Sequence, residues 1–137
     1  MRITADTNLL VRVIVADDAE QSMLAETELA HADLVALPLV ALCEMVWTLS
    51  RAYKLSKPQI ALAVRTLVNS HNVVTDHSAI EAGLAMLEAG GDFADGVIAH
   101  EGSLLGGQVF VSFDKQAVQS VIARGGQARL PIDQAGR

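Results

Sequence analysis

The sequence predicts an α/β protein in which helices cover both faces of a parallel sheet. Short aliphatic runs alternate with longer stretches of helical periodicity along the 137 residues. Glycine pairs and helix-capping residues separate these segments. Parallel neighbours need a crossover connection, so this alternation favours a helix-covered parallel sheet. The length, with 51% hydrophobic residues, predicts a single domain over residues 1–137.

The first half of the chain is expected to hold three strands and four helices. The strands are short aliphatic runs that end near polar residues or proline, at 3–5, 34–37 and 73–74. The helices follow apolar periodicity, at 9–15, 20–31, 39–53 and 57–71. The start of the last is marked by Ser56 as cap and Pro58 in the first turn, where its missing N–H does no harm.

The second half continues the alternation with three helices and two strands. Ser78 is expected to cap a helix to Glu88, and Asp92 a helix that runs to Leu105. Glycine pairs after both helices end them. The remaining segments are a strand at 109–112, a helix at 115–124 and a strand at 128–130, followed by an irregular tail after Pro131.

Four carboxylates interrupt segments that are otherwise apolar: Asp6, Glu44, Asp95 and Asp114. Only Asp114 has a basic neighbour, Lys115. An ionised carboxylate against apolar surface costs several kcal/mol or more without a counter-charge, so the set predicts a shared divalent ion. Asp6 and Asp114 both follow strands, and sites in parallel sheets lie beyond the carboxyl ends of strands. We therefore expect them at the same edge of the sheet.

Each acid also has a simpler interpretation. Asp6, Asp92 and Asp114 each precede an expected helix and can cap it. Asp95 lies three residues after Asp92, past the capping position, so capping does not explain it. Glu44 can lie in water if its helix is at the domain edge. The prediction therefore depends on the set and not on any one member.

The available ligands indicate which metal ion the chain would bind. Carboxylate oxygens suit Mg²⁺ or Mn²⁺, whereas the four histidines are not spaced as ligand pairs and Cys43 is the only cysteine, which argues against zinc. Carboxylates that hold hard divalent ions favour attack of water on a phosphoryl group. The net charge of −6 argues against gripping nucleic acid by bulk electrostatics, although the predicted site accounts for much of the excess.

Four segments together resemble the PIN domain, specifically the VapC-type toxins of bacterial toxin–antitoxin pairs. They are Asp6-Thr7-Asn8, the helix with Glu44, the stretch GGDFADGVIAH, and Val-Ser-Phe-Asp ending at Asp114. The resemblance implies a three-layer α/β/α sandwich and a Mg²⁺- or Mn²⁺-dependent endoribonuclease. It carries the catalytic and metal-ligand roles onto Asp6, Glu44, Asp95 and Asp114, with Asp92 as an auxiliary ligand. Asn8 and Ser112 match positions that line such sites.

The resemblance also implies partners: an RNA substrate, a second copy of the chain in a homodimer, and a cognate antitoxin that covers the active groove. The candidates for RNA contact are basic residues, with Lys115 best placed beside Asp114: Arg12, Arg51, Lys54, Lys57 and Lys115. Residues 1–6 lack a signal-peptide pattern and no run has the length of a membrane span, so a cytoplasmic protein is expected.

Three other functions remain open from the residues alone. A haloacid-dehalogenase-type phosphatase also places an aspartate after its first strand, but needs a second acid where this chain has Asn8. A receiver domain would use Asp76 with Lys115, a poor version of its pattern. A PIN-like fold kept only for binding would not need to retain all four acids.

Overall fold

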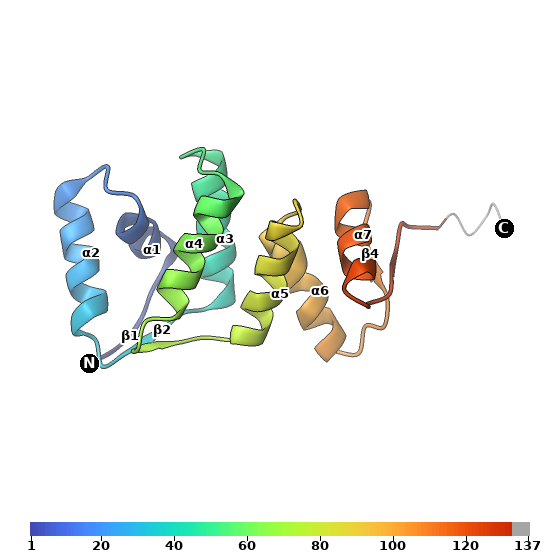
Figure 1. Ribbon diagram of the computed structural model, residues 1–137. Coiled ribbons are helices and arrows are strands. Elements are labelled where there is room, and N and C mark those ends of the chain that lie inside the picture. The colour runs from blue at the N-terminus through green and yellow to red at the C-terminus, as the bar shows by residue number, and fades with distance from the viewer. Residues whose placement is uncertain (133–137) are drawn as a thin grey trace. The chain divides into compact units, whose positions relative to one another are not determined.

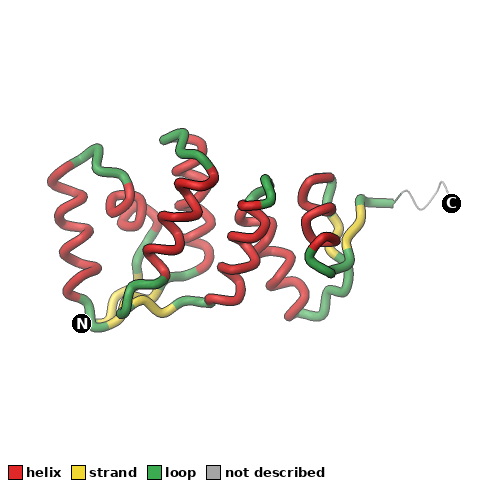
Figure 2. Tube along the Cα trace, viewed as in Figure 1, coloured by secondary structure: helices red, strands yellow, loops and turns green. Residues whose placement is uncertain are grey.

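The computed structural model describes residues 1–132, in which seven helices and five strands alternate (Figure 1). The chain divides into two compact units, unit 1 from Met1 to His77 and unit 2 from Ser78 onward. Each unit holds its own hydrogen-bonded group of parallel strands. Figure 2 shows the helices and the short strands that alternate with them. The predicted α/β class with parallel strands is confirmed.

Unit 1 contains a three-stranded parallel sheet in the order β1-β2-β3, with Ile3 opposite Val35 and Val35 opposite Val73. The strands are β1 (Arg2–Thr4), β2 (Leu34–Ala36) and β3 (Val73–Val74). The helices are α1 (Thr7–Ile14), α2 (Ala19–His31), α3 (Leu39–Arg51) and α4 (Lys57–Val68). Because Val35 is central and fully buried, side chains from α1, α3 and α4 complete the core around it: Leu10, Leu42, Met45, Leu49, Ile60 and Val64.

Unit 2 contains a two-stranded parallel sheet, with Phe110 opposite Ala128. Its strands are β4 (Phe110–Val111) and β5 (Ala128–Arg129), and its helices are α5 (His77–Glu88), α6 (Phe93–Leu104) and α7 (Lys115–Ala123). Phe93 at the start of α6 is fully buried beside Gly83 of α5, where an added Cβ would lie 2.7 Å from the ring. Gly83 therefore leaves the space that the aromatic ring fills.

Gly96 is the second small residue between α5 and α6. A Cβ on Gly96 would lie 2.4 Å from the carbonyl oxygen of Ala82 and 2.8 Å from the Cα atom of Gly83. Real Cβ atoms do not approach backbone so closely, so only glycine lets the two helix backbones come together here. The structure thus gives Gly96 a packing role between α5 and α6.

All twelve predicted elements are present, with differences at their ends. The helix expected over 39–53 ends at Arg51, and Lys54 then takes a left-handed backbone conformation with φ of 57°. Ser78 was wrongly predicted as a cap, because α5 already begins at His77. The capping box at Ser56 is confirmed: the Gln59 amide donates to its hydroxyl at 3.3 Å, and its own amide donates to the Gln59 side chain at 2.9 Å. Part of the predicted irregular tail, residues 133–137, lies outside the described residues.

Candidate metal and active site

In unit 1, two predicted ligands, Asp6 and Glu44, lie next to a contact between the start of α1 and α3. Asp6 follows β1 and caps α1, with its Oδ1 accepting a hydrogen bond from the Leu9 amide at 2.9 Å. The next residue, Thr7, donates its hydroxyl to Oε2 of Glu44 at 3.0 Å. The Asp-Thr step at the start of α1 therefore places one carboxylate and orients the other. The exposed Asn8 follows directly.

In unit 2, three carboxylates lie at the N-terminal ends of α6 and α7. Asp92 caps α6 by accepting from the Ala94 amide at 2.8 Å. Asp114 caps α7 by accepting from the amides of Gln116 at 2.9 Å and Ala117 at 3.2 Å. Ser112 accepts a hydrogen bond from the Asp114 amide at 3.0 Å, which fixes the turn before the helix.

Asp95 is the electrostatic centre of the unit 2 group. It lies in the first turn of α6 and is half-buried. Its pKa is raised, first by burial and then by the negative charges of Asp92 and Asp114. Neither Asp95 nor its two neighbours forms an ion pair within residues 1–132. The charges of Asp92 and Asp114 therefore act on Asp95 without a cation to offset them in this part of the chain.

The three caps leave part of each carboxylate available for a ligand. In Asp6, Asp92 and Asp114 the helix amides bond to Oδ1 only, and no hydrogen bond to Oδ2 is formed in the part of the chain described here. Within residues 1–132, no three carboxylate, imidazole or thiolate groups are placed so as to hold a metal ion. The structure thus gives partial ligand groups in each unit, and convergence of all four predicted ligands stays a prediction.

The donor chemistry of these groups fits a hard divalent cation. All donors are carboxylate oxygens, and the raised pKa of Asp95 marks a position where added positive charge would be stabilising. A divalent ion would offset the repulsion among Asp92, Asp95 and Asp114. Mg²⁺ and Mn²⁺ accept such oxygen ligands together with water.

Several sequence predictions are resolved here. Capping is confirmed for Asp6, Asp92 and Asp114, whereas Asp95 is not a cap. For Glu44 the alternative interpretation holds, because Glu44 is exposed and so are its apolar neighbours Val40 and Trp47 on the same face of α3. One side of α3 therefore faces solvent, while Leu42, Met45 and Leu49 on its other side are buried.

The RNA-contact candidates differ in their surroundings. Arg12 pairs with Asp17 at 2.7 Å, and the Tyr53 hydroxyl donates to the same carboxylate at 3.2 Å. RNA contact by Arg12 would have to compete with this cluster. Lys115, beside Asp114 at the start of α7, is exposed and forms no ion pair within residues 1–132.

Sequence reasoning missed the partner of Glu44. Thr7 appeared only as the middle of Asp6-Thr7-Asn8, and nothing local to the sequence connects it to a residue 37 positions away. The contact of Arg51 with Trp47 was also missed, although their spacing of four residues on a helix places such side chains together.

Comparison with known proteins gives one family match. A family model described as PIN domain matches residues 3–123, which spans both units and all the predicted ligands. PIN domains are a nuclease-type fold that commonly depends on divalent metal ions, so the match supports the three-layer α/β/α class and a hydrolase at a coarse level. No curated protein matches the chain. Among the described residues, no helix combines the length and the apolar character needed to cross a membrane.

Proposed function

We propose that this chain, which belongs to the PIN domain family, is a metal-dependent endoribonuclease and the toxin of a toxin–antitoxin pair. The observation that carries the proposal is Asp95, a half-buried carboxylate in the first turn of α6 that burial and the charges of Asp92 and Asp114 destabilise, with no cationic partner in residues 1–132. The burial and repulsion at Asp95 cost free energy in the metal-free protein, and a bound divalent cation would offset that cost. A protein that needed these acids only as helix caps would not need Asp95.

In this proposal Asp6, Glu44, Asp95 and Asp114 hold one or more Mg²⁺ or Mn²⁺ ions, with Asp92 as an auxiliary ligand. Helix capping supports the assignment, because a carboxylate fixed through Oδ1 presents Oδ2 in a defined direction. The Thr7 hydroxyl does the same for Glu44. Asn8 and Ser112 line the site.

The reaction would be attack of water on an RNA phosphodiester. The bound cation would supply neutralisation of charge on the phosphate and activation of the water. The carboxylates would hold the ion and its water in place, and one of them would accept the proton from that water. Lys115, adjacent to Asp114, would hold a phosphate oxygen of the substrate.

The proposal includes two protein partners. A cognate antitoxin would cover the groove, and an arginine from it would pair with the carboxylates in place of the metal. A second copy of the chain would complete a homodimer. These partners follow from the VapC-type resemblance of the acidic segments, and mass measurement of the protein with and without its antitoxin would test them.

RNA cleavage by the purified protein tests the activity. We expect cleavage with Mg²⁺ or Mn²⁺, none with EDTA, and none from the Asp6→Asn or Asp95→Asn variants. Asp18→Asn is a matched control, because Asp18 caps α2 as Asp6 caps α1, with its carboxylate accepting the Gln21 amide at 3.0 Å. This control should cut RNA at the parent rate.

Two results would overturn the assignment. Undiminished cleavage by the Asp95→Asn variant would remove the residue on which the proposal depends. Release of phosphate from monoesters, without cleavage of RNA, would indicate a phosphatase instead. Growth arrest on expression of the parent chain, and not of the Asp95→Asn variant, would support the toxin role.

A further inference from the structure

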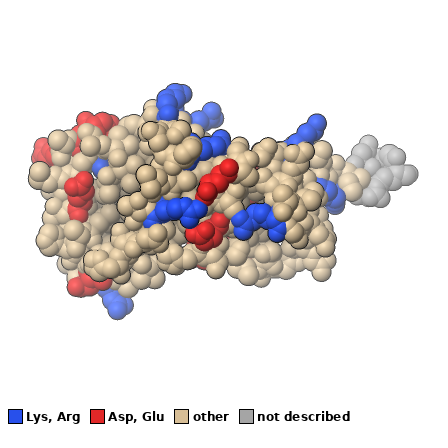
Figure 3. All heavy atoms as spheres, viewed as in Figure 1, with Lys and Arg blue, Asp and Glu red and all other residues tan. Residues whose placement is uncertain are grey.

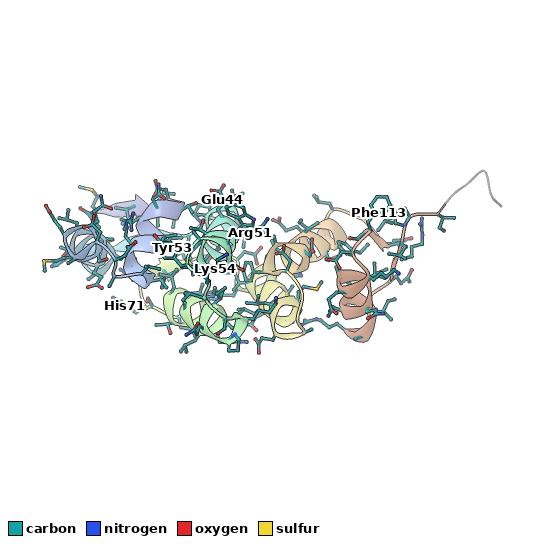
Figure 4. The ribbon with its side chains drawn as sticks, turned by 90° about the horizontal axis from the view of Figure 1, so that it is seen from above. Glu44, Arg51, Tyr53, Lys54, His71 and Phe113 are labelled. Carbon is teal, nitrogen blue, oxygen red and sulfur yellow. The ribbon has the colours of Figure 1, made fainter. Side chains whose placement is uncertain are left out.

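One face of α3 carries a row of side chains that unit 1 does not bury. Val40, Glu44, Trp47 and Arg51 are spaced four, three and four residues apart and so lie in one stripe along the helix. Trp47 is 60% exposed. Tryptophan is the largest apolar side chain and is normally well covered, so its exposure on a helix face indicates a contact surface. In Figure 4, Glu44 and Arg51 lie along α3, with Lys54 beside it.

The exposed indole already has a cation above it. The Arg51 guanidinium carbon lies 5.7 Å from the centre of the Trp47 ring, a cation–π distance. Arg51 is itself exposed, in the last turn of α3. This pair presents a planar aromatic surface together with a positive charge, which is the combination that binds an unpaired base and its phosphate.

The segment that contains this face has a net charge opposite to that of the whole chain. Residues 34–75 contain four Lys or Arg and a single acid, Glu44, so this segment carries a net charge of +3 in a chain of net −6. Lys and Arg side chains gather over the end of unit 1 where α3 ends and α4 begins (Figure 3). Lys54 and Lys57 are exposed there, and neither forms an ion pair within residues 1–132. The left-handed conformation of Lys54, with φ of 57°, allows the tight turn that separates it from α3.

We propose that Trp47 is a stacking platform for an unpaired base of single-stranded RNA, with Arg51, Lys54 and Lys57 holding the adjoining phosphates. Trp47 follows Glu44 by three residues, which is about 4.5 Å along the helix axis. A base on Trp47 therefore brings the neighbouring sugar-phosphate backbone to Glu44, a proposed metal ligand. This inference rests on the proposed ribonuclease function and adds to it the residue that binds an unpaired base.

Single strands are favoured over duplexes by the geometry of stacking. The faces of bases in a duplex are covered by their neighbours, so an indole can stack only on a base that is unpaired or splayed out. Base–aromatic stacking also tolerates different bases, because each base has a π-face. Trp47 would thus set the single-strand requirement and contribute little to the choice of sequence.

The test uses Trp47 as its own reporter, because it is the only tryptophan in the chain. The full-length protein in EDTA is titrated with a short single-stranded RNA and with the same RNA annealed to its complement. We expect saturable quenching of the indole fluorescence by the single strand, and about tenfold weaker binding of the duplex. In a parallel titration with fluorescently labelled RNA, Trp47→Ala should weaken binding about tenfold and Trp47→Phe should restore most of it.

Two further variants separate stacking from general effects. Leu62→Ala removes another large apolar side chain of unit 1, 67% exposed on α4, and should leave RNA affinity unchanged. Arg51→Gln should weaken binding and reduce its dependence on salt, because one phosphate contact is lost. The melting temperatures of all variants are measured, so that loss of folding is recognised.

Three outcomes would overturn the inference. They are unchanged RNA affinity of Trp47→Ala, equal quenching by single strand and duplex, and a change from dimer to monomer in Trp47→Ala without a change in RNA affinity. The last would show that a second copy of the chain covers this face. Because binding is measured without metal, the two proposals can fail separately. If the protein binds RNA through Trp47 but does not cleave it, only the nuclease proposal is contradicted. If the protein cleaves RNA and Trp47→Ala has no effect on binding, only this inference is contradicted.

Discussion

Replacement of Gly96 by alanine tests the packing of unit 2. The glycine lies in α6 where the backbone of α5 passes, and a Cβ there would be 2.4 Å from the Ala82 oxygen and 2.8 Å from the Gly83 Cα. Ordinary contacts of a Cβ are about 3.4 Å or longer, so α5 and α6 would have to separate by about 1 Å. The obstructing atoms belong to backbone, which cannot rotate away as a side chain can.

The magnitude follows from two opposing effects. Overpacking a rigid contact costs about 1–3 kcal/mol, and the upper end applies because backbone must move. Alanine in place of glycine in a helix contributes about 1 kcal/mol in the opposite direction. The net expectation is a loss of about 2 kcal/mol in the free energy of unfolding. For a chain of 137 residues this corresponds to a melting temperature roughly 6–10 °C lower.

The measurement is thermal or urea unfolding of the parent and two variants in EDTA. Gly102→Ala is the matched control, because it lies in the same helix and an added Cβ meets nothing within 4 Å. It receives the gain in helix propensity without the clash, so its melting temperature should equal or exceed that of the parent. The two substitutions should therefore have opposite signs.

A single comparison would refute this reasoning. If Gly96→Ala were as stable as Gly102→Ala, α5 and α6 would not pack closely at this point. A loss in both variants would instead show that glycine is needed in α6 for a reason other than the contact with α5.

Two other predictions concern the acids. Because burial, Asp92 and Asp114 raise the pKa of Asp95 above the value of about 3.9 usual for an unfolded chain, folding favours its protonated form. The metal-free parent should therefore lose stability relative to Asp95→Asn as pH rises from about 4 through the folded pKa. Melting temperatures of both proteins at pH 4, 5.5 and 7 would measure this loss. A difference in melting temperature that did not depend on pH would contradict the prediction. Thr7→Val removes the hydroxyl that donates to Glu44, so Mn²⁺ affinity, followed by the rise in melting temperature on titration, should fall about 10–100-fold. Thr27→Val, whose hydroxyl donates only to the Met23 carbonyl in its own helix, should bind Mn²⁺ as the parent does.

The sequence alone determined the elements and the helix caps, because both depend on residues within one or two turns of each other. Asp92 precedes α6 and Ser56 precedes α4 in patterns that satisfy free amides locally, and the structure confirms both. The unusual position of Asp95 was also visible, since an acid past the capping position has no local partner. Ser78 failed as a cap because a helix can begin one residue early when nothing local opposes it.

Only the tertiary structure decided which of these residues meet. The bond from Thr7 to Glu44 and the close approach of Gly96 to Ala82 depend on how α1 packs on α3 and α6 on α5, and packing is set by whole helix faces. The exposure of Trp47 has the same origin. Its apolar character predicts burial, but the core of unit 1 is filled from the opposite face of α3 by Leu42, Met45 and Leu49, which leaves the indole in solvent.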